Sequence, residues 1–95
     1  MELRVLNYFL TVVYEENITS AAEKLHITQP TLSRQLMQLE EELGVSLFRR
    51  GKKKITLTSE GLLLKRRAEE ILDLTSRTEL ELKEQKTLMN GEIAI

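Results

Sequence analysis

Apolar residues return every three or four positions in four stretches of this chain, which predicts a mainly helical protein. The first stretch, about residues 2–14, should bury a face that carries Leu3, Leu6, Phe9, Leu10 and Val13. The second is short and begins near Thr19, whose hydroxyl can cap a helix N-terminus. It continues through Ala21 and Ala22, and such small residues let a crossing helix approach closely.

The third stretch covers about residues 29–43 and has an unbroken apolar stripe, formed by Leu32, Leu36, Leu39 and Leu43. Thr28 precedes it as a capping residue, and Pro30 falls in the first turn, where its missing N–H would have no helical partner. Gly44 follows as the usual left-handed C-cap. Because only residues 25–27 separate the two helices, the sequence predicts a helix-turn-helix over about residues 18–37.

A short basic hairpin comes next. The run 49–54 holds five positive charges around Gly51, and it lies between the apolar pair Leu47 and Phe48 and a return strand at 55–57. A glycine in a basic turn between short strands predicts a wing, a loop able to reach the phosphates or the minor groove of a duplex. The alternative interpretation is a loop that serves only solubility.

The polar face of the third helix is the candidate reading surface. At about 100° per residue, the face opposite the leucine stripe and its flanks carry Gln29, Pro30, Thr31, Ser33, Arg34 and Gln38. Arginine can donate two hydrogen bonds to guanine, glutamine can pair with adenine, and a threonine methyl can touch a thymine methyl. A merely solvated face is the alternative. The run 40–42 of three glutamates points in successive directions and is expected to be solvated surface.

Taken together, these residues resemble the N-terminal DNA-binding domain of a LysR-type transcriptional regulator. The resemblance covers essentially the whole chain. It rests on Leu3 with Phe9, Ser20-Ala21-Ala22, Leu25, the run Thr28-Gln29-Pro30-Thr31-Leu32-Ser33-Arg34-Gln35, Leu39-Glu40, Leu43-Gly44, Leu47-Phe48, Arg50, Leu57-Thr58 and Gly61. It implies a winged helix-turn-helix over residues 1–58, with helix 29–43 in the major groove and wing 49–54 on the DNA backbone or in the minor groove.

The resemblance also implies a role for individual side chains. Base reading would fall to the six polar-face residues Gln29, Pro30, Thr31, Ser33, Arg34 and Gln38. Backbone and wing contacts would come from Thr19, Thr28, Arg50, Lys52 and Lys53. The partner would be double-stranded DNA that carries a palindromic operator, a short sequence with a T and an A at its two ends.

The fourth stretch predicts a linker helix over residues 59–89, capped by Thr58 and roughly 46 Å long at about 1.5 Å per residue. A heptad-like seam runs along it, formed by Leu64, Ala68, Ile71, Thr75, Thr78, Leu82, Gln85 and Met89, with Leu72 beside it. A lone helix cannot bury such a stripe, so a partner is expected, and the resemblance implies antiparallel packing of two linker helices in a homodimer. The polar step from Thr75 to Thr78 leaves the register open toward Leu72 or Leu74.

The last residues, 90–95, are expected to leave the helix at Asn90-Gly91 and to begin a strand. The resemblance implies that a ligand-sensing domain would start there. That domain is absent from this chain, and in the full-length protein it would bind a small-molecule inducer. Family members are often tetramers through this domain.

Composition excludes several classes of function. The chain has no cysteine, one histidine and no phosphate-binding glycine loop, so no catalytic, cofactor-binding or metal-ligating residues are predicted, and the protein should not be an enzyme. No apolar run approaches the roughly 20 residues of a membrane span, and no signal peptide is visible, so a cytoplasmic, nucleoid-associated protein is expected.

The net charge of −1 hides an uneven distribution. Residues 1–57 hold eight basic and seven acidic side chains, whereas residues 58–95 hold six and eight. Positive charge therefore gathers in the wing, and local basic patches are what a DNA-binding protein needs. A winged-helix module for protein interaction or oligomerisation is the alternative. It would expose an apolar patch where this helix carries polar residues.

Overall fold

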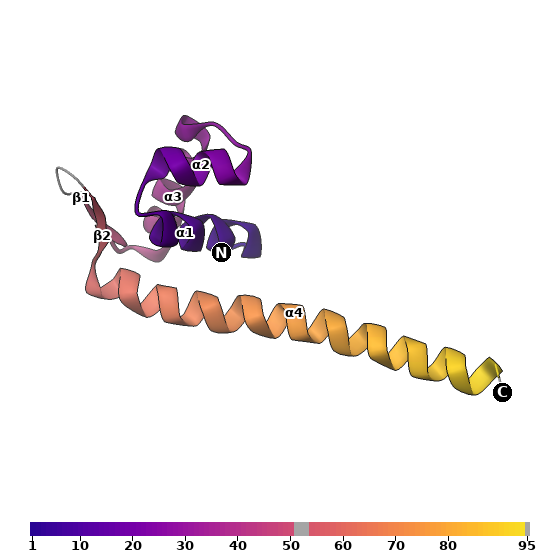
Figure 1. The fold of residues 1–95 in the computed structure, drawn as a ribbon. Helices are drawn as coiled ribbons and strands as arrows, with labels where there is room; N and C mark the ends of the chain where they lie inside the picture. The colour runs from indigo at the N-terminus through magenta and orange to yellow at the C-terminus, as the bar shows by residue number, and fades with distance from the viewer. Residues whose placement is uncertain (51–53, 95) are drawn as a thin grey trace.

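In the computed structural model, which describes residues 1–50 and 54–94, three helices and a two-stranded wing form a compact head, and a long helix extends from it (Figure 1). The elements are α1 (Leu3–Glu15), α2 (Ile18–Leu25), α3 (Gln29–Leu43), β1 (Phe48–Arg50), β2 (Ile55–Leu57) and α4 (Ser59–Ala94). The long helix makes the molecule elongated, with extents of 64 × 26 × 20 Å. The mainly helical, winged helix-turn-helix fold predicted from the sequence is confirmed.

The core centres on α1, which lies between α2 and α3 on one side and α4 on the other (Figure 1). The buried apolar side chains of the core are Val5, Leu6, Phe9, Leu10, Val12, Ala21, Ala22, Leu32, Leu36, Leu39, Leu47 and Ala68. Because α1 is covered from two sides, it buries a wider face than expected. Val5 and Val12 are buried, whereas Leu3 is 46% exposed and Val13 is only partly buried.

Local capping interactions set the ends of the two helices of the helix-turn-helix. The prediction that Thr19 caps the shorter helix is wrong, because α2 begins at Ile18 and the side chain of Asn17 accepts a hydrogen bond from the Ser20 N–H at 2.9 Å. Thr28 caps α3 as predicted, accepting from the Thr31 N–H at 3.3 Å. Gly44 ends α3 with a left-handed φ of 71°, also as predicted.

A backbone junction at Ser46 and Leu47 ties the wing to α3 and α4. The Leu47 N–H donates to the Glu40 carboxylate at 2.7 Å, so the expectation that Glu40 is only solvated surface is wrong. Thr58 closes the other side: its N–H donates to the Leu47 carbonyl at 3.0 Å and its hydroxyl donates to the Ser46 carbonyl at 2.6 Å. The same hydroxyl oxygen accepts from the Gly61 N–H at 3.0 Å, which caps α4 as predicted.

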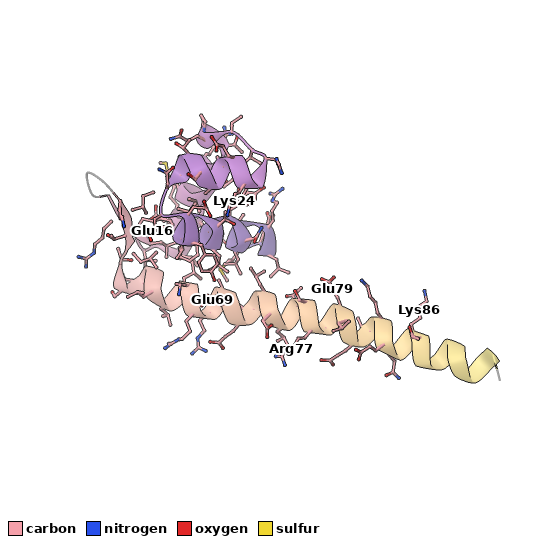
Figure 2. All side chains as sticks on the ribbon, viewed as in Figure 1. Glu16, Lys24, Glu69, Arg77, Glu79 and Lys86 are labelled. Atoms are coloured by element: carbon pink, nitrogen blue, oxygen red, sulfur yellow. The ribbon has the colours of Figure 1, made fainter. Side chains whose placement is uncertain are left out.

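The first half of α4 packs on α1, and the second half extends into solvent. Ala68 is fully buried, and the Tyr14 hydroxyl donates a hydrogen bond to the Glu69 carboxylate. All residues over 76–87 are exposed, and Figure 2 shows Arg77, Glu79 and Lys86 projecting from a stretch of helix that has no neighbour among the described residues. The head therefore positions only the start of α4.

The end of α4 differs from the sequence-based prediction. The helix continues through Asn90 and Gly91 to Ala94, so the predicted helix end at residue 89 is wrong. The predicted strand over 92–95 is wrong up to Ala94, and Ile95 lies outside the described residues. A single glycine inside a helix costs only about 1 kcal/mol relative to alanine. Without a proline nearby, that cost is too small to end the helix.

Titration of Tyr14 should report the contact between α1 and α4. The hydrogen bond to Glu69, together with partial burial and the Glu69 charge, raises the pKa of Tyr14 from 10.0 to about 12. A raised pKa means that this contact stabilises the fold fully below about pH 10 and that the contribution is lost as pH rises through about 12. The ultraviolet titration curve of the wild type, after that of Tyr14→Phe is subtracted, should show this late ionisation. Glu69→Gln should return it toward pH 10.0, and an unchanged titration would contradict the contact.

Candidate nucleic-acid interface

The first turns of α3 present the polar side chains predicted from the sequence. Gln29, Pro30 and Arg34 are exposed, whereas Thr31 and Ser33 are partly buried at the flanks. The buried leucines of α3 hold this face outward, because Leu32, Leu36 and Leu39 pack into the core. The polar face is therefore carried by a helix that is fixed along its whole opposite side.

Gln38 lies apart from Gln29. Nine residues at about 100° each place the two half a turn apart on α3. Gln38 accordingly lines a small hollow beside the chain N-terminus, together with Gln35 and Glu42, whose carboxylate pairs with the Met1 ammonium at 2.5 Å. The structure thus places the predicted reading residues on two flanks of one helix.

A larger hollow of about 780 Å³ separates α3 from the wing. Its lining residues are Ile18, Gln29, Ser33, Leu36, Met37, Glu40, Ser46, Phe48 and Ile55. Leu36, Met37, Phe48 and Ile55 supply apolar groups to the lining, and Gln29, Ser33, Glu40 and Ser46 supply polar groups. Sequence reasoning missed Ser46 as a member of this surface, because only the placement of the wing beside α3 brings it there.

The hydroxyl groups of three threonines at the interface, Thr19, Thr28 and Thr31, form hydrogen bonds within the protein. Thr19 donates to the Gln29 side-chain oxygen at 3.2 Å. Thr28 donates to the Thr31 hydroxyl at 2.7 Å while it caps α3. The predicted backbone-contact residues Thr19 and Thr28 therefore lie beside the reading helix and help to order it.

The wing points alternate side chains toward the core and toward solvent. The antiparallel strands pair Phe48 with Leu57 and Arg49 with Thr56. Phe48 packs against Phe9, with ring centroids 5.3 Å apart, so Arg49 and Thr56 face outward and are exposed. Lys54 is exposed and pairs with Glu16 at 3.3 Å. The predicted contacts of Lys52 and Lys53, and of the Arg50 side chain, lie outside the described residues.

The predicted dimer seam on α4 divides into two parts. Its first half packs on the head of the same chain: Ala68 is fully buried, and Leu64, Ile71 and Leu72 are packed against the core. Ala68 is thus wrongly assigned to the dimer seam, because α1 already covers it.

The second half of the seam remains uncovered by the described chain. Leu82 is 65% exposed and Leu74 is 57% exposed, and Thr78 is exposed between them at spacings of four. Thr75 is partly buried, and its hydroxyl donates to the Ile71 carbonyl. The Met89 side chain lies outside the described residues.

Other kinds of site find little support in the part of the chain that the structure describes. No group of three or more His, Cys, Asp or Glu side chains there is placed to hold a metal ion. No helix over the same residues is both long and apolar enough to cross a membrane.

Comparison with protein families and solved structures gives consistent results. Residues 3–62 match the family described as bacterial regulatory helix-turn-helix protein, lysR family. The HTH-type transcriptional regulator BsdA of Bacillus subtilis (strain 168) is 52% identical over 96 residues, which cover 100% of this chain and 33% of BsdA. BenM of Acinetobacter baylyi is 56% identical over 61 residues, which cover 64% of this chain and 20% of BenM.

Two solved protein–DNA complexes have the same fold. The BenM DBD in complex with benA site 1 DNA has a TM-score of 0.86 at 44% identity, covering 88% of this chain and 94% of that chain. The CbnR DBD in complex with DNA has a TM-score of 0.83 at 38% identity, covering 87% of this chain and 95% of that chain. The present chain spans about a third or less of the length of the curated relatives.

Proposed function

The chain belongs to the lysR family of bacterial regulatory helix-turn-helix proteins, and we propose that it is the DNA-reading part of a transcriptional regulator that binds double-stranded DNA sequence-specifically. The observation that carries the proposal is the polar, outward face of α3, held rigidly beside a hollow and a wing. The BenM and CbnR domains that share this fold were solved in complex with DNA. The relatives are transcriptional regulators rather than enzymes.

The proposed mechanism inserts the first turns of α3 into the major groove. Arg34 would donate to a guanine edge, while Gln29 would reach a neighbouring base. Glu41 and Glu42 are exposed at the far end of α3, and their charge would repel phosphates, so base contact should stop before them. The wing, with Arg49 and the basic residues beyond it, would follow the DNA backbone.

Dimerisation is the second part of the proposal. The exposed side chains of Leu74, Thr78 and Leu82 form one stripe on the half of α4 that extends away from the rest of the described chain. A second copy packed antiparallel along this stripe would cover it and would pair two heads about a two-fold axis. A symmetric pair of heads reads a palindrome, with the half-site spacing set by the dimer.

The whole protein would add further parts to this reading unit. Because the relatives are about three times as long or longer, we expect a sensing domain for a small-molecule inducer outside this chain and assembly into tetramers there. A protein that acts on operators would work in the cytoplasm at the nucleoid. No cofactor is assigned to the present residues.

Selection from a duplex pool tests the proposed function. Binding to the pool is measured by fluorescence anisotropy at about 150 mM salt, and the bound fraction is then sequenced. The bound duplexes should be enriched in a short palindrome with a T and an A at its ends. Salt-sensitive binding without enrichment would mean that the basic surface binds DNA phosphates but that α3 does not read the bases. Absence of binding would instead favour the winged-helix protein-interaction module.

Arg34→Ala should weaken binding to the selected operator by about 1–3 kcal/mol and relax base preference at one position, because a side chain that donates to one base edge is lost. Arg49→Ala is the comparison, since a phosphate contact carries no sequence information. It should weaken binding to all duplexes similarly and lower the salt slope by about 1. Competition titrations with single-base operator variants measure both effects. An unchanged preference in Arg34→Ala would contradict the assigned reading face.

A further inference from the structure

The side chains of Thr19 and Gln29 meet across the turn between α2 and α3. Thr19 lies in the first turn of α2 and Gln29 is the first residue of α3, and the Thr19 hydroxyl donates to the Gln29 side-chain oxygen at 3.2 Å. The left-handed His26 and the Ile27 N–H bond to the Ala22 carbonyl at 3.1 Å fold the chain back at this turn. Both partners are exposed, and Gln29 is one of the residues that line the hollow between α3 and the wing.

We propose that Thr19 is a positioning residue that fixes the side-chain amide of Gln29 for base reading. A glutamine amide rotates broadly about its last torsion and can turn either its oxygen or its nitrogen outward. The Thr19 bond holds the oxygen toward α2, so the two N–H groups of the amide face the DNA. The base atoms that accept such donors in the major groove are a purine N7, guanine O6 and thymine O4. This inference rests on the proposed function.

Thr19 would thereby act on specificity rather than on general affinity. A threonine hydroxyl carries a single donor proton, and here that proton goes to Gln29 instead of to a phosphate oxygen. A phosphate contact would raise affinity for every sequence, whereas an oriented amide changes only the discrimination at the base pair it faces. The two roles for Thr19 therefore predict different experimental results.

The fold does not depend on this hydroxyl. Asn17 caps α2 and Thr28 caps α3, so neither helix needs Thr19 for its N-terminus. Valine has the same branched shape as threonine and a similar helix propensity. Thr19→Val should therefore leave the unfolding midpoint close to that of the wild type, and a change in DNA reading can be attributed to the lost donor.

The experiment compares operator variants in which each base pair is replaced in turn, using anisotropy competition with the whole chain. Thr19→Val should reduce discrimination at one base pair by at least about fivefold, the low end of the effect of one base contact. The other positions and the salt slope should not change. Thr19→Ser keeps the donor and should restore discrimination. Thr11→Val is the matched control, because the Thr11 hydroxyl donates to the Asn7 carbonyl within α1, away from the interface.

A double-mutant cycle adds a second criterion. Gln29→Ala should lose discrimination at the same base pair, and Thr19→Val should add nothing in that background if Thr19 acts through Gln29. Additive losses, a loss spread evenly over all sequences with a salt slope lower by about 1, or an unchanged profile would each overturn the inference. A wild-type protein without any base preference would overturn the proposed function itself, and the inference with it.

Discussion

Replacement of Gly61 by alanine is expected to destabilise the domain by about 3 kcal/mol, the upper end of the usual cost of overpacking. A Cβ atom at Gly61 would lie 2.1 Å from the Leu47 carbonyl oxygen and 2.9 Å from a methyl carbon of Leu57. The first neighbour is backbone, and it is held in place because it accepts a hydrogen bond from the Thr58 N–H. The start of α4 would have to move away from the head. Urea unfolding followed by circular dichroism measures the loss.

Gly44 provides the matched control for this substitution. It has a left-handed φ of 71°, yet a Cβ atom there would have no neighbour within 4 Å. Gly44→Ala should therefore cost only the left-handed strain, about 1–2 kcal/mol. If Gly61→Ala were no more destabilising than Gly44→Ala, the close approach at Leu47 would be more easily relaxed than its hydrogen bonds suggest.

The contrast between the two glycines shows what local sequence can reveal. Gly44 follows an amphipathic helix, where a left-handed C-cap is the usual arrangement, and its role was predictable. Gly61 lies inside a helix, and sequence alone marked it only through the family resemblance. Its physical reason is the approach of a backbone oxygen from the wing junction, which depends on packing between segments distant in sequence.

The same limit explains the errors in the predicted core and dimer seam. Helical periodicity correctly identified the apolar stripe of α4, but a stripe does not specify which surface covers it. The structure assigns Ala68 to α1 of the same chain and leaves Leu82 exposed. Likewise, Asn17 and Thr19 both have side chains that can cap a helix. Asn17 is the cap because α2 begins at Ile18, and the sequence alone did not fix that starting residue.

The reading face was more predictable than its surroundings. The exposed position of Arg34 follows from the leucine stripe of its own helix, so periodicity was sufficient. The Glu40 bond to the Leu47 N–H and the Thr19 bond to Gln29 join different elements. Such contacts require the relative placement of α2, α3 and the wing, and no local pattern indicates them.

Leu82→Arg is expected to dissociate the proposed dimer, raising its dissociation constant at least about 100-fold. Leu82 is 65% exposed in the single chain and lies on the stripe with Leu74 and Thr78. In a two-fold interface each residue occurs twice, so two unpaired charges would enter an apolar contact, where an uncompensated buried charge costs about 3 kcal/mol or more. Sedimentation should show monomers, and binding to a palindrome should weaken because the two heads are no longer joined.

Leu80→Arg tests whether the effect belongs to this face of α4. Leu80 is 55% exposed on the same helix, and two residues at about 100° each place it on the side opposite Leu82. This variant has the same added charge and a similar change in helix propensity, yet it should remain a dimer and bind the palindrome normally. Equal dissociation by both variants would indicate a general effect of charge on α4. A dimer that survives Leu82→Arg but not Leu80→Arg would move the interface to the opposite face of the helix.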